Sequence, residues 1–276
     1  MQTLKPLEPG VVFWGERDSV AEIRGLGVRC GQLVVPGGMP LSWHAVKRWQ
    51  ADLEREEFTL GAVFAAYEGE DYADIPTVKR TVGFIPRETR TAREVRTREV
   101  SEFAAGIGVN AIACHIGMVP HDTADEDYIG VRDLVRRICD FAAEREQTFA
   151  LETGQEPAGV LLQFFKDVDR PNLRINFDPA NMILYGSGEP VEALRKLAKH
   201  VISVHCKDGD WPPAGVPGAL GSERPLGKGA VGIERFVATL KEIGFQGTLN
   251  VERETENQEE RLRDIRAAVA WLKTLT

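Results

Sequence analysis

The second half of the chain contains TFALE at residues 148–152, LRINFD at 173–178, VISVH at 201–205 and TLNVE at 248–252. Each segment is short and rich in branched or aromatic apolar residues, as expected for strands of a parallel sheet that are covered on both faces. Longer amphipathic segments lie between and beside them, at residues 157–166, 190–200 and 232–243. A repeated order of strand and helix predicts parallel pairing through right-handed crossovers.

The same alternation extends through the first half of the chain. It predicts strands at residues 11–14, 28–35, 59–66 and 111–116, and further helices at 19–26, 42–57, 88–107, 125–146 and 256–275. Eight such units in 276 residues predict an α/β protein, a (β/α)8 TIM barrel that forms a single domain over residues 1–276. A doubly wound open sheet is the alternative, but no GxGxxG motif follows the first strand. The two long connections, 68–86 and 209–229, are expected to help shape a pocket.

The composition limits the classes of partner. With 34 Lys and Arg against 42 Asp and Glu, the formal net charge is −8, which argues against nucleic acid as a ligand. The N-terminal segment lacks the apolar core of a signal peptide, and no run approaches the roughly 18 apolar residues of a membrane span. We therefore expect a cytoplasmic protein with no membrane partner. Its four cysteines are far apart and should be reduced and mostly buried: Cys30, Cys114, Cys139 and Cys206.

Four consecutive predicted strands end in metal-binding side chains. These are Glu152, Asp178, His205 and Glu252. In a parallel barrel the carboxyl ends of the strands meet at one face, where active sites lie, so these four side chains should come together. A single acidic residue after a strand is more often a helix cap, but four on neighbouring strands are harder to explain in that way. Three carboxylates and one imidazole suit one divalent ion, Mn²⁺, Mg²⁺, Co²⁺ or Zn²⁺.

Longer segments around these strand ends resemble a known family. FALETGQE (149–156), INFDPANMILYG (175–186), VHCKDGDW (204–211) and PLGKGAVGIERFVATLKEIGFQGTLNVERE (225–254) are similar to the sugar phosphate isomerase/epimerase family with a xylose isomerase-like barrel. The resemblance implies that Glu152, Asp178, His205 and Glu252 are the metal ligands. It also implies that Glu152 and Glu252 are the acid/base pair.

The function expected from this site is isomerisation or epimerisation of a sugar, a related polyol or a keto-acid. A metal-bound carbonyl and hydroxyl would acidify the neighbouring C–H, and two carboxylates would move the proton through an enediolate. The alternative is a lyase or dehydratase acting on a keto-sugar or inosose with the same metal site. An endonuclease IV-like nuclease and a non-catalytic barrel are less favoured. The nuclease members carry a D-x-H pair that RPLGKGAVG (224–232) lacks.

Other residues are candidates for contact with the substrate. Asn181 stands where many relatives carry the histidine of a D-x-x-H motif, and Trp211 stands where ketose 3-epimerases place an arginine. His115 either contacts substrate or packs in the core. Lys207 either holds a substrate oxygen in the pocket or pairs with a carboxylate. Trp14 offers an apolar face to a sugar ring or closes the barrel wall.

Two expectations concern the ligand and the next helix. The chain shows no glycine-rich phosphate-binding motif, which favours an unphosphorylated small-molecule sugar or polyol as the partner, and a homo-oligomer is possible. Gln155 and Glu156 either contact the substrate or form a solvated cap on the following helix.

Overall fold

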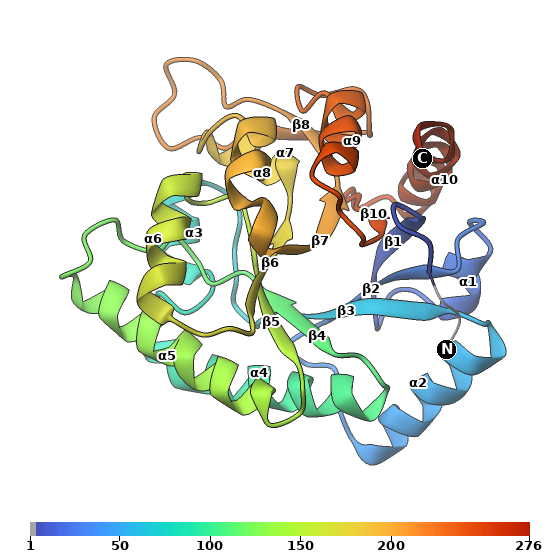
Figure 1. Cartoon of the computed structure of the whole chain (residues 1–276), viewed down its shortest axis with the longest axis horizontal. Helices are drawn as coiled ribbons and strands as arrows, with labels where there is room; N and C mark the ends of the chain where they lie inside the picture. Colours follow the sequence, from blue (N-terminus) through green and yellow to red (C-terminus); the bar gives the residue numbers. More distant parts are fainter. Residues whose placement is uncertain (1–3) are drawn as a thin grey trace.

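The computed structural model describes residues 4–276, and eight parallel strands in it close into a barrel (Figure 1). The order around the barrel is β1-β10-β7-β6-β5-β4-β3-β2, with β2 pairing back onto β1. This confirms the predicted (β/α)8 barrel. The strands are β1 Pro9–Trp14, β2 Cys30–Val35, β3 Thr59–Ala65, β4 Ala111–Cys114, β5 Thr148–Glu152, β6 Leu173–Phe177, β7 Val201–Cys206 and β10 Leu249–Val251.

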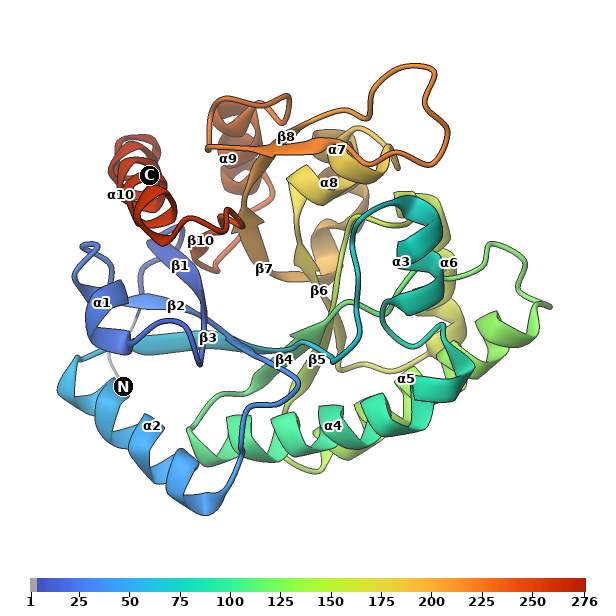
Figure 2. The same ribbon diagram turned by 180° about the vertical axis from the view of Figure 1, so that it is seen from behind.

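Helices surround the strands on the outside of the barrel, as the view from behind also shows (Figure 2). They are α1 Val20–Arg24, α2 Trp43–Arg55, α3 Ile75–Thr81, α4 Arg87–Gly106, α5 Glu126–Ala143, α6 Ala158–Val168, α7 Pro179–Tyr185, α8 Pro190–Leu197, α9 Ile233–Glu242 and α10 Gln258–Leu275, with the short 3-10 turn Ala198–His200 after α8. None of the helices in the described part of the chain combines the length and the apolar character that crossing a bilayer requires.

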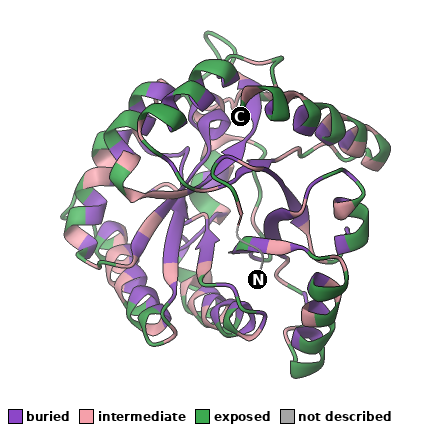
Figure 3. Cartoon of the chain, turned by 45° about the vertical axis from the view of Figure 1, so that its right-hand side comes forward, coloured by how far each residue is buried: buried purple, intermediate pink, exposed green. Residues whose placement is uncertain are grey.

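Two apolar layers hold the barrel together. The larger one lies between the strands and the inward faces of the helices, while the outer faces of the helices are exposed (Figure 3). A smaller one fills the inside of the barrel, where side chains from alternate strand positions meet. Its buried members are Val12, Val34, Ala62, Phe64, Ala113 and Ala150. All four cysteines are free and buried, as predicted.

Some elements differ from the prediction. The predicted strands 28–35 and 248–252 are shorter in the structure, since β2 begins at Cys30 and β10 ends at Val251. Helix α7 was not predicted, nor was α3 inside the connection 68–86. The connection 209–229 also contains a small antiparallel pair, β8 (Asp208–Asp210) with β9 (Ser222–Arg224). Helix α7 and strand β9 contribute residues to the walls of the site at the carboxyl ends of the strands.

Candidate active site and metal centre

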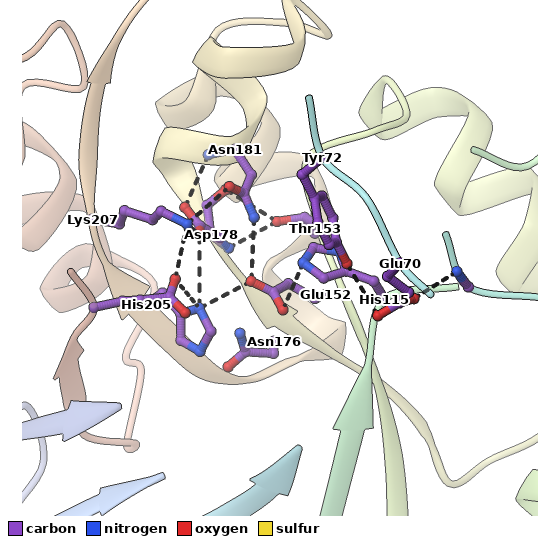
Figure 4. Close-up of polar contacts among 12 residues, drawn as sticks. Glu70, Tyr72, His115, Glu152, Thr153, Asn176, Asp178, Asn181, His205 and Lys207 are labelled. Atoms are coloured by element: carbon purple, nitrogen blue, oxygen red, sulfur yellow. Dashed lines mark hydrogen bonds and ion pairs between the residues drawn. The ribbon is translucent and has the colours of Figure 1, made fainter. Parts of the chain in front are cut away.

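The four predicted metal-binding side chains meet at the carboxyl end of the barrel. Figure 4 labels Glu152, Asp178 and His205 among them. Glu152 is the last residue of β5, Asp178 follows β6, His205 is in β7 and Glu252 follows β10. One possible ligand atom from each residue lies within 4.8 Å of those of the other three. The alternation of strands and helices brings them together, because β5, β6, β7 and β10 are consecutive around the barrel.

The atoms that face the centre of this cluster lack hydrogen-bond partners. They are His205 Nδ1, Asp178 Oδ2 and Glu252 Oε2, all buried. His205 Nδ1 lies 3.0 Å from Glu152 Oε1 and 3.1 Å from Glu252 Oε2. Buried polar atoms are seldom left without partners, and a cation is the partner that carboxylates and an imidazole nitrogen share. The donor set therefore fits a divalent metal ion.

The electrostatics of the cluster come from burial and from charges in contact. Burial alone would lower the pKa of His205, but the charges of Glu252 and Glu152 outweigh it and raise that pKa well above its ordinary value. Burial also acts to raise the pKa of Glu252, yet His205 and Lys207 hold this pKa far below its usual range. At Asp178 burial dominates and raises the pKa. The cluster is thus a buried, tightly coupled set of charges.

A polar network inside the barrel fixes the orientation of His205. Its Nε2 lies 2.8 Å from Gln32 Oε1, and Gln32 Nε2 in turn donates to Asn176 Oδ1 at 3.2 Å. Ser203 Oγ donates to the same Asn176 oxygen at 2.6 Å. Because the Gln32 amide nitrogen is engaged by Asn176, its oxygen faces the imidazole and accepts from Nε2–H. This arrangement directs Nδ1 toward the carboxylates.

Asp178 connects the cluster to helix α7. Its Oδ1 accepts hydrogen bonds from the backbone N–H groups of Ala180 and Asn181, at 2.8 and 3.0 Å, so that Asp178 is the N-cap of α7. The Thr153 hydroxyl accepts from the Asp178 N–H at 2.8 Å. These bonds leave Oδ2 directed at His205 and Lys207.

Lys207 is buried among carboxylates. Its Nζ lies 3.2 Å from Glu252 Oε2 and 2.8 Å from Glu254 Oε2. Asn181 bridges Lys207 to the cluster, since its Oδ1 accepts from Lys207 at 3.4 Å and its Nδ2 donates to Glu152 at 3.2 Å. Of the two predicted roles for Lys207, pairing with a carboxylate is therefore present in the structure.

A cavity of about 410 Å³ opens onto the cluster. This is near the lower end of the roughly 300–1,000 Å³ found for small-molecule sites. All four predicted substrate contacts line it: Trp14, His115, Asn181 and Lys207. His115 also pairs with the cluster, because its Nε2 lies 3.1 Å from Glu152 Oε2. The two long connections contribute walls, as predicted, through Glu70, Tyr72, Leu220, Gly221 and Glu223.

The expectation of a solvated cap at Gln155 and Glu156 was wrong. Both residues are buried, and Glu156 Oε1 accepts a hydrogen bond from the Val119 N–H at 2.8 Å. Burial raises the pKa of Glu156 to about 7. The loop before α6 turns inward toward the segment that follows β4, so neither side chain reaches the solvent. Neither residue lines the cavity at the cluster.

The sequence interpretation also missed several acidic and aromatic residues of the cavity. Glu223 and Glu254 lie on its rim, together with Glu70, Tyr72 and Tyr185. The sequence could have indicated Glu254 as a cavity residue, because it lies two positions beyond Glu252 in NVERE. Glu223 lies in a connection without periodicity, and only the pairing of β8 with β9 brings it to the site.

The fold and the site together define a TIM barrel with a candidate divalent-metal centre at the carboxyl ends of its strands. The model of the xylose isomerase-like TIM barrel family matches residues 20–275. The chain belongs to this family, which agrees with the resemblance seen in the strand-end segments.

Solved and curated relatives agree with this assignment. A xylose isomerase domain protein from Planctomyces limnophilus is 39% identical, with a TM-score of 0.93 over 98% of this chain and 97% of that one. The L-ribulose-5-phosphate 3-epimerase UlaE of Salmonella paratyphi A is 26% identical over 181 residues, which are 64% of this chain. The match spans 61% of the length of that curated relative. A D-allulose 3-epimerase from Methylomonas sp. in complex with D-allulose is 15% identical, with a TM-score of 0.71 over 100% of this chain and 99% of that one, and shows the shared fold alone.

Proposed function

We propose that this chain is a divalent-metal-dependent sugar isomerase or epimerase that moves a proton at a carbon next to a carbonyl. The observation that carries the proposal is the cluster of Glu152, Asp178, His205 and Glu252. His205 Nδ1, Asp178 Oδ2 and Glu252 Oε2 form no regular hydrogen bond, and Glu152 and Glu252 line a small cavity. Relatives named as sugar epimerases support the proposal.

Glu152, Asp178, His205 and Glu252 would hold the ion, which is Mn²⁺, Mg²⁺, Co²⁺ or Zn²⁺ on the chemistry of the donor set. Such an ion polarises a carbonyl and makes the neighbouring C–H more acidic. Gln32 keeps His205 Nδ1 directed at the cluster, and Asp178 is held by the first N–H groups of α7. The rest of the chemistry belongs to the protein's own side chains.

Glu152 and Glu252 are the proposed acid/base pair. They come from opposite ends of the β5–β6–β7–β10 segment of the barrel, so a ligand between them presents one face to each. Each carboxylate contacts a basic side chain, Glu152 through His115 and Glu252 through Lys207. One carboxylate would remove the proton, and the other would return one to the opposite face in an epimerisation. Lys207, His115 and Asn181 would contact substrate oxygens, and Trp14 would contact the apolar side of the sugar.

Exchange of solvent deuterium tests this proposal. Metal-loaded protein in D2O should introduce deuterium next to the carbonyl of at least one ketose, measured by NMR, and the product spectrum separates an isomer or epimer from a dehydrated product. Glu152→Gln and Glu252→Gln should each slow exchange by about 10²-fold or more, as expected for general acid–base groups. Glu144→Gln, an exposed change outside the site, is the control. Full exchange in both site variants with metal bound would show that the acid/base assignment is wrong.

A further inference from the structure

The charged side chains that line the cavity at the cluster are mainly acidic. Five glutamates line it: Glu70, Glu152, Glu223, Glu252 and Glu254. Within residues 4–276, Lys207 is the one lysine or arginine that lines the same cavity. A divalent ion would offset charge at Glu152, Asp178 and Glu252, but Glu223 and Glu254 lie beyond this cluster on the rim. There they pair with the two neighbouring cations, Lys207 and Arg253, so the cavity-lining residues that the structure describes offer an anionic ligand no unpaired positive charge.

The single lysine is already paired. Lys207 is 3% exposed and has carboxylate oxygens of Glu252 and Glu254 within 3.2 Å. The neighbouring Arg253 does not line the cavity and pairs with Glu223 at 2.7 Å and Asp264 at 3.1 Å. Glu223 also accepts from the Glu254 N–H at 3.1 Å, which holds this acidic rim in place. Neither cation is free to bind a phosphate group.

The glycine-rich loop after β7 is filled by a carboxylate of the chain itself. In TIM barrels the loops after the seventh and eighth strands frequently bind phosphate through backbone N–H groups. Here Asp208 Oδ2 accepts from the N–H groups of Gly227 and Gly229, at 2.9 and 3.0 Å. Its Oδ1 accepts from Gly209 and Val231, at 2.9 and 3.1 Å.

This carboxylate cannot give way easily to a ligand. Asp208 is 1% exposed, and a Cβ atom on Gly229 would lie 2.4 Å from its Oδ1, so the loop is packed directly onto it. A nest of backbone N–H groups does exist in the loop, but its anion is Asp208.

The backbone N–H groups at the start of helix α7 are also bound by an aspartate of the chain. The N–H groups of Ala180 and Asn181 both donate to Asp178 Oδ1. Helix termini and nests are the backbone sites that bind phosphate in other proteins. At this end of the barrel, Asp178 occupies the helix terminus and Asp208 occupies the nest.

From these contacts we infer that the site selects an uncharged ketose or related polyol and discriminates against its phosphate ester. The inference rests on the proposed function and specifies its substrate class. It separates this chain from a relative named for a 5-phosphate substrate, the L-ribulose-5-phosphate 3-epimerase. Selectivity arises because Glu223 and Glu254 pair with Arg253 and Lys207, which leaves no free cation among the cavity-lining residues that the structure describes.

Matched pairs of ligands test the inference. The metal-loaded full chain would be given free ketopentoses and ketohexoses and the corresponding 5- or 6-phosphates, with deuterium exchange and dissociation constants measured in parallel. We expect kcat/KM and affinity to favour the free sugar by at least about tenfold. A preference for the phosphate esters would overturn the inference. If no ligand exchanges deuterium, the proposed function fails, and the binding preference alone still decides the substrate class.

Charge-neutral variants locate the source of the selectivity. Glu254→Gln should remove the nearer of the two carboxylates that pair with Lys207 and shift the ratio of affinities several-fold toward the phosphate ester. Glu223→Gln provides a second test at the same rim. Glu256→Gln, an exposed change outside the cavity, should leave the ratio unchanged. Ratios that stay at the wild-type value in both rim variants would contradict a role of the acidic rim.

Discussion

The imidazole of His205 is held from behind by a neutral side chain. Gln32 Oε1 lies 2.8 Å from His205 Nε2, and both residues are buried. Side chains that bind the second nitrogen of a metal-binding histidine fix its ring orientation, and their loss typically weakens metal affinity by about 10–100-fold. Gln32 is therefore a positioning residue for the candidate metal centre.

Replacement of this amide tests its positioning role. We predict that Gln32→Met, which has a similar volume but cannot accept the hydrogen bond, weakens Mn²⁺ binding by about 10-fold or more. Titration of Mn²⁺ followed by electron paramagnetic resonance measures the dissociation constant directly. Gln163→Met on the exposed face of α6 is the matched control. An unchanged dissociation constant in a folded Gln32→Met protein would rule out the positioning role.

Glu156 should make stability depend on pH. Burial raises its pKa from 4.5 to about 7, so the folded protein favours the protonated acid more than the unfolded chain does. The stabilisation of the folded state by protonated Glu156 is fully present below about pH 4.5 and is lost as the pH rises through 7. Glu156→Gln removes this dependence. Between pH 5 and pH 8, the free energy of unfolding should therefore fall by about 1–3 kcal/mol more in wild type than in this variant.

Denaturant unfolding at the two pH values measures this difference. Glu144→Gln, whose side chain is exposed, should show no such change. A Glu156→Gln protein with the same pH dependence as wild type would mean that Glu156 is ionised in the folded state across this range.

At the residue scale, the sequence predicted the side chains that end strands. Glu152, Asp178, His205 and Glu252 each follow a readable apolar run, and their convergence follows from the barrel alone. Gln32 could not be predicted, since it lies in the interior of a strand and its partner is 173 positions away.

The connection between β7 and α9 is organised by one buried carboxylate. Asp208 accepts four backbone N–H groups, from Gly209, Gly227, Gly229 and Val231. Asp208→Asn would place an amide NH2 group against two of these donors in either orientation of the amide. Leaving buried donors unpaired costs about 1–3 kcal/mol each.

We predict faster hydrogen exchange at these backbone amides in Asp208→Asn than in wild type. Mass spectrometry or NMR of the 225–231 loop provides the measurement. Asp210→Asn removes an exposed pair with Arg224 and should leave the loop amides protected. Equal protection in wild type and Asp208→Asn would contradict the account of the filled nest.

At the element scale, long periodic segments were predictable and short ones were not. Helix α5 carries a buried stripe at helical spacing, which the sequence displays. Helix α7 has only 7 residues and depends on its cap, Asp178, and on packing in the barrel mouth. The pair β8–β9 consists of 3-residue strands whose register is set by tertiary contacts. Local periodicity carries too little information for such elements.

The whole molecule is closed by contacts between its two ends. Helix α10 lies beside β1 (Figure 1). Arg261 of this helix forms a buried ion pair with Asp18. Asp18 Oδ2 also accepts from the Trp14 N–H at 3.0 Å, so this pair supports the cavity wall. Strand alternation and length predicted the closed barrel, but not this specific contact, because neither residue belongs to a recognisable motif.

The central claim is that four strand ends bind one divalent ion at the carboxyl face of the barrel. Anomalous X-ray scattering from crystals of the full chain grown with Mn²⁺ tests it most directly. We predict one ion per chain, bound by Glu152, Asp178, His205 and Glu252. Saturating Mn²⁺ with no anomalous peak among these four side chains, or with ions bound only elsewhere, would contradict the account.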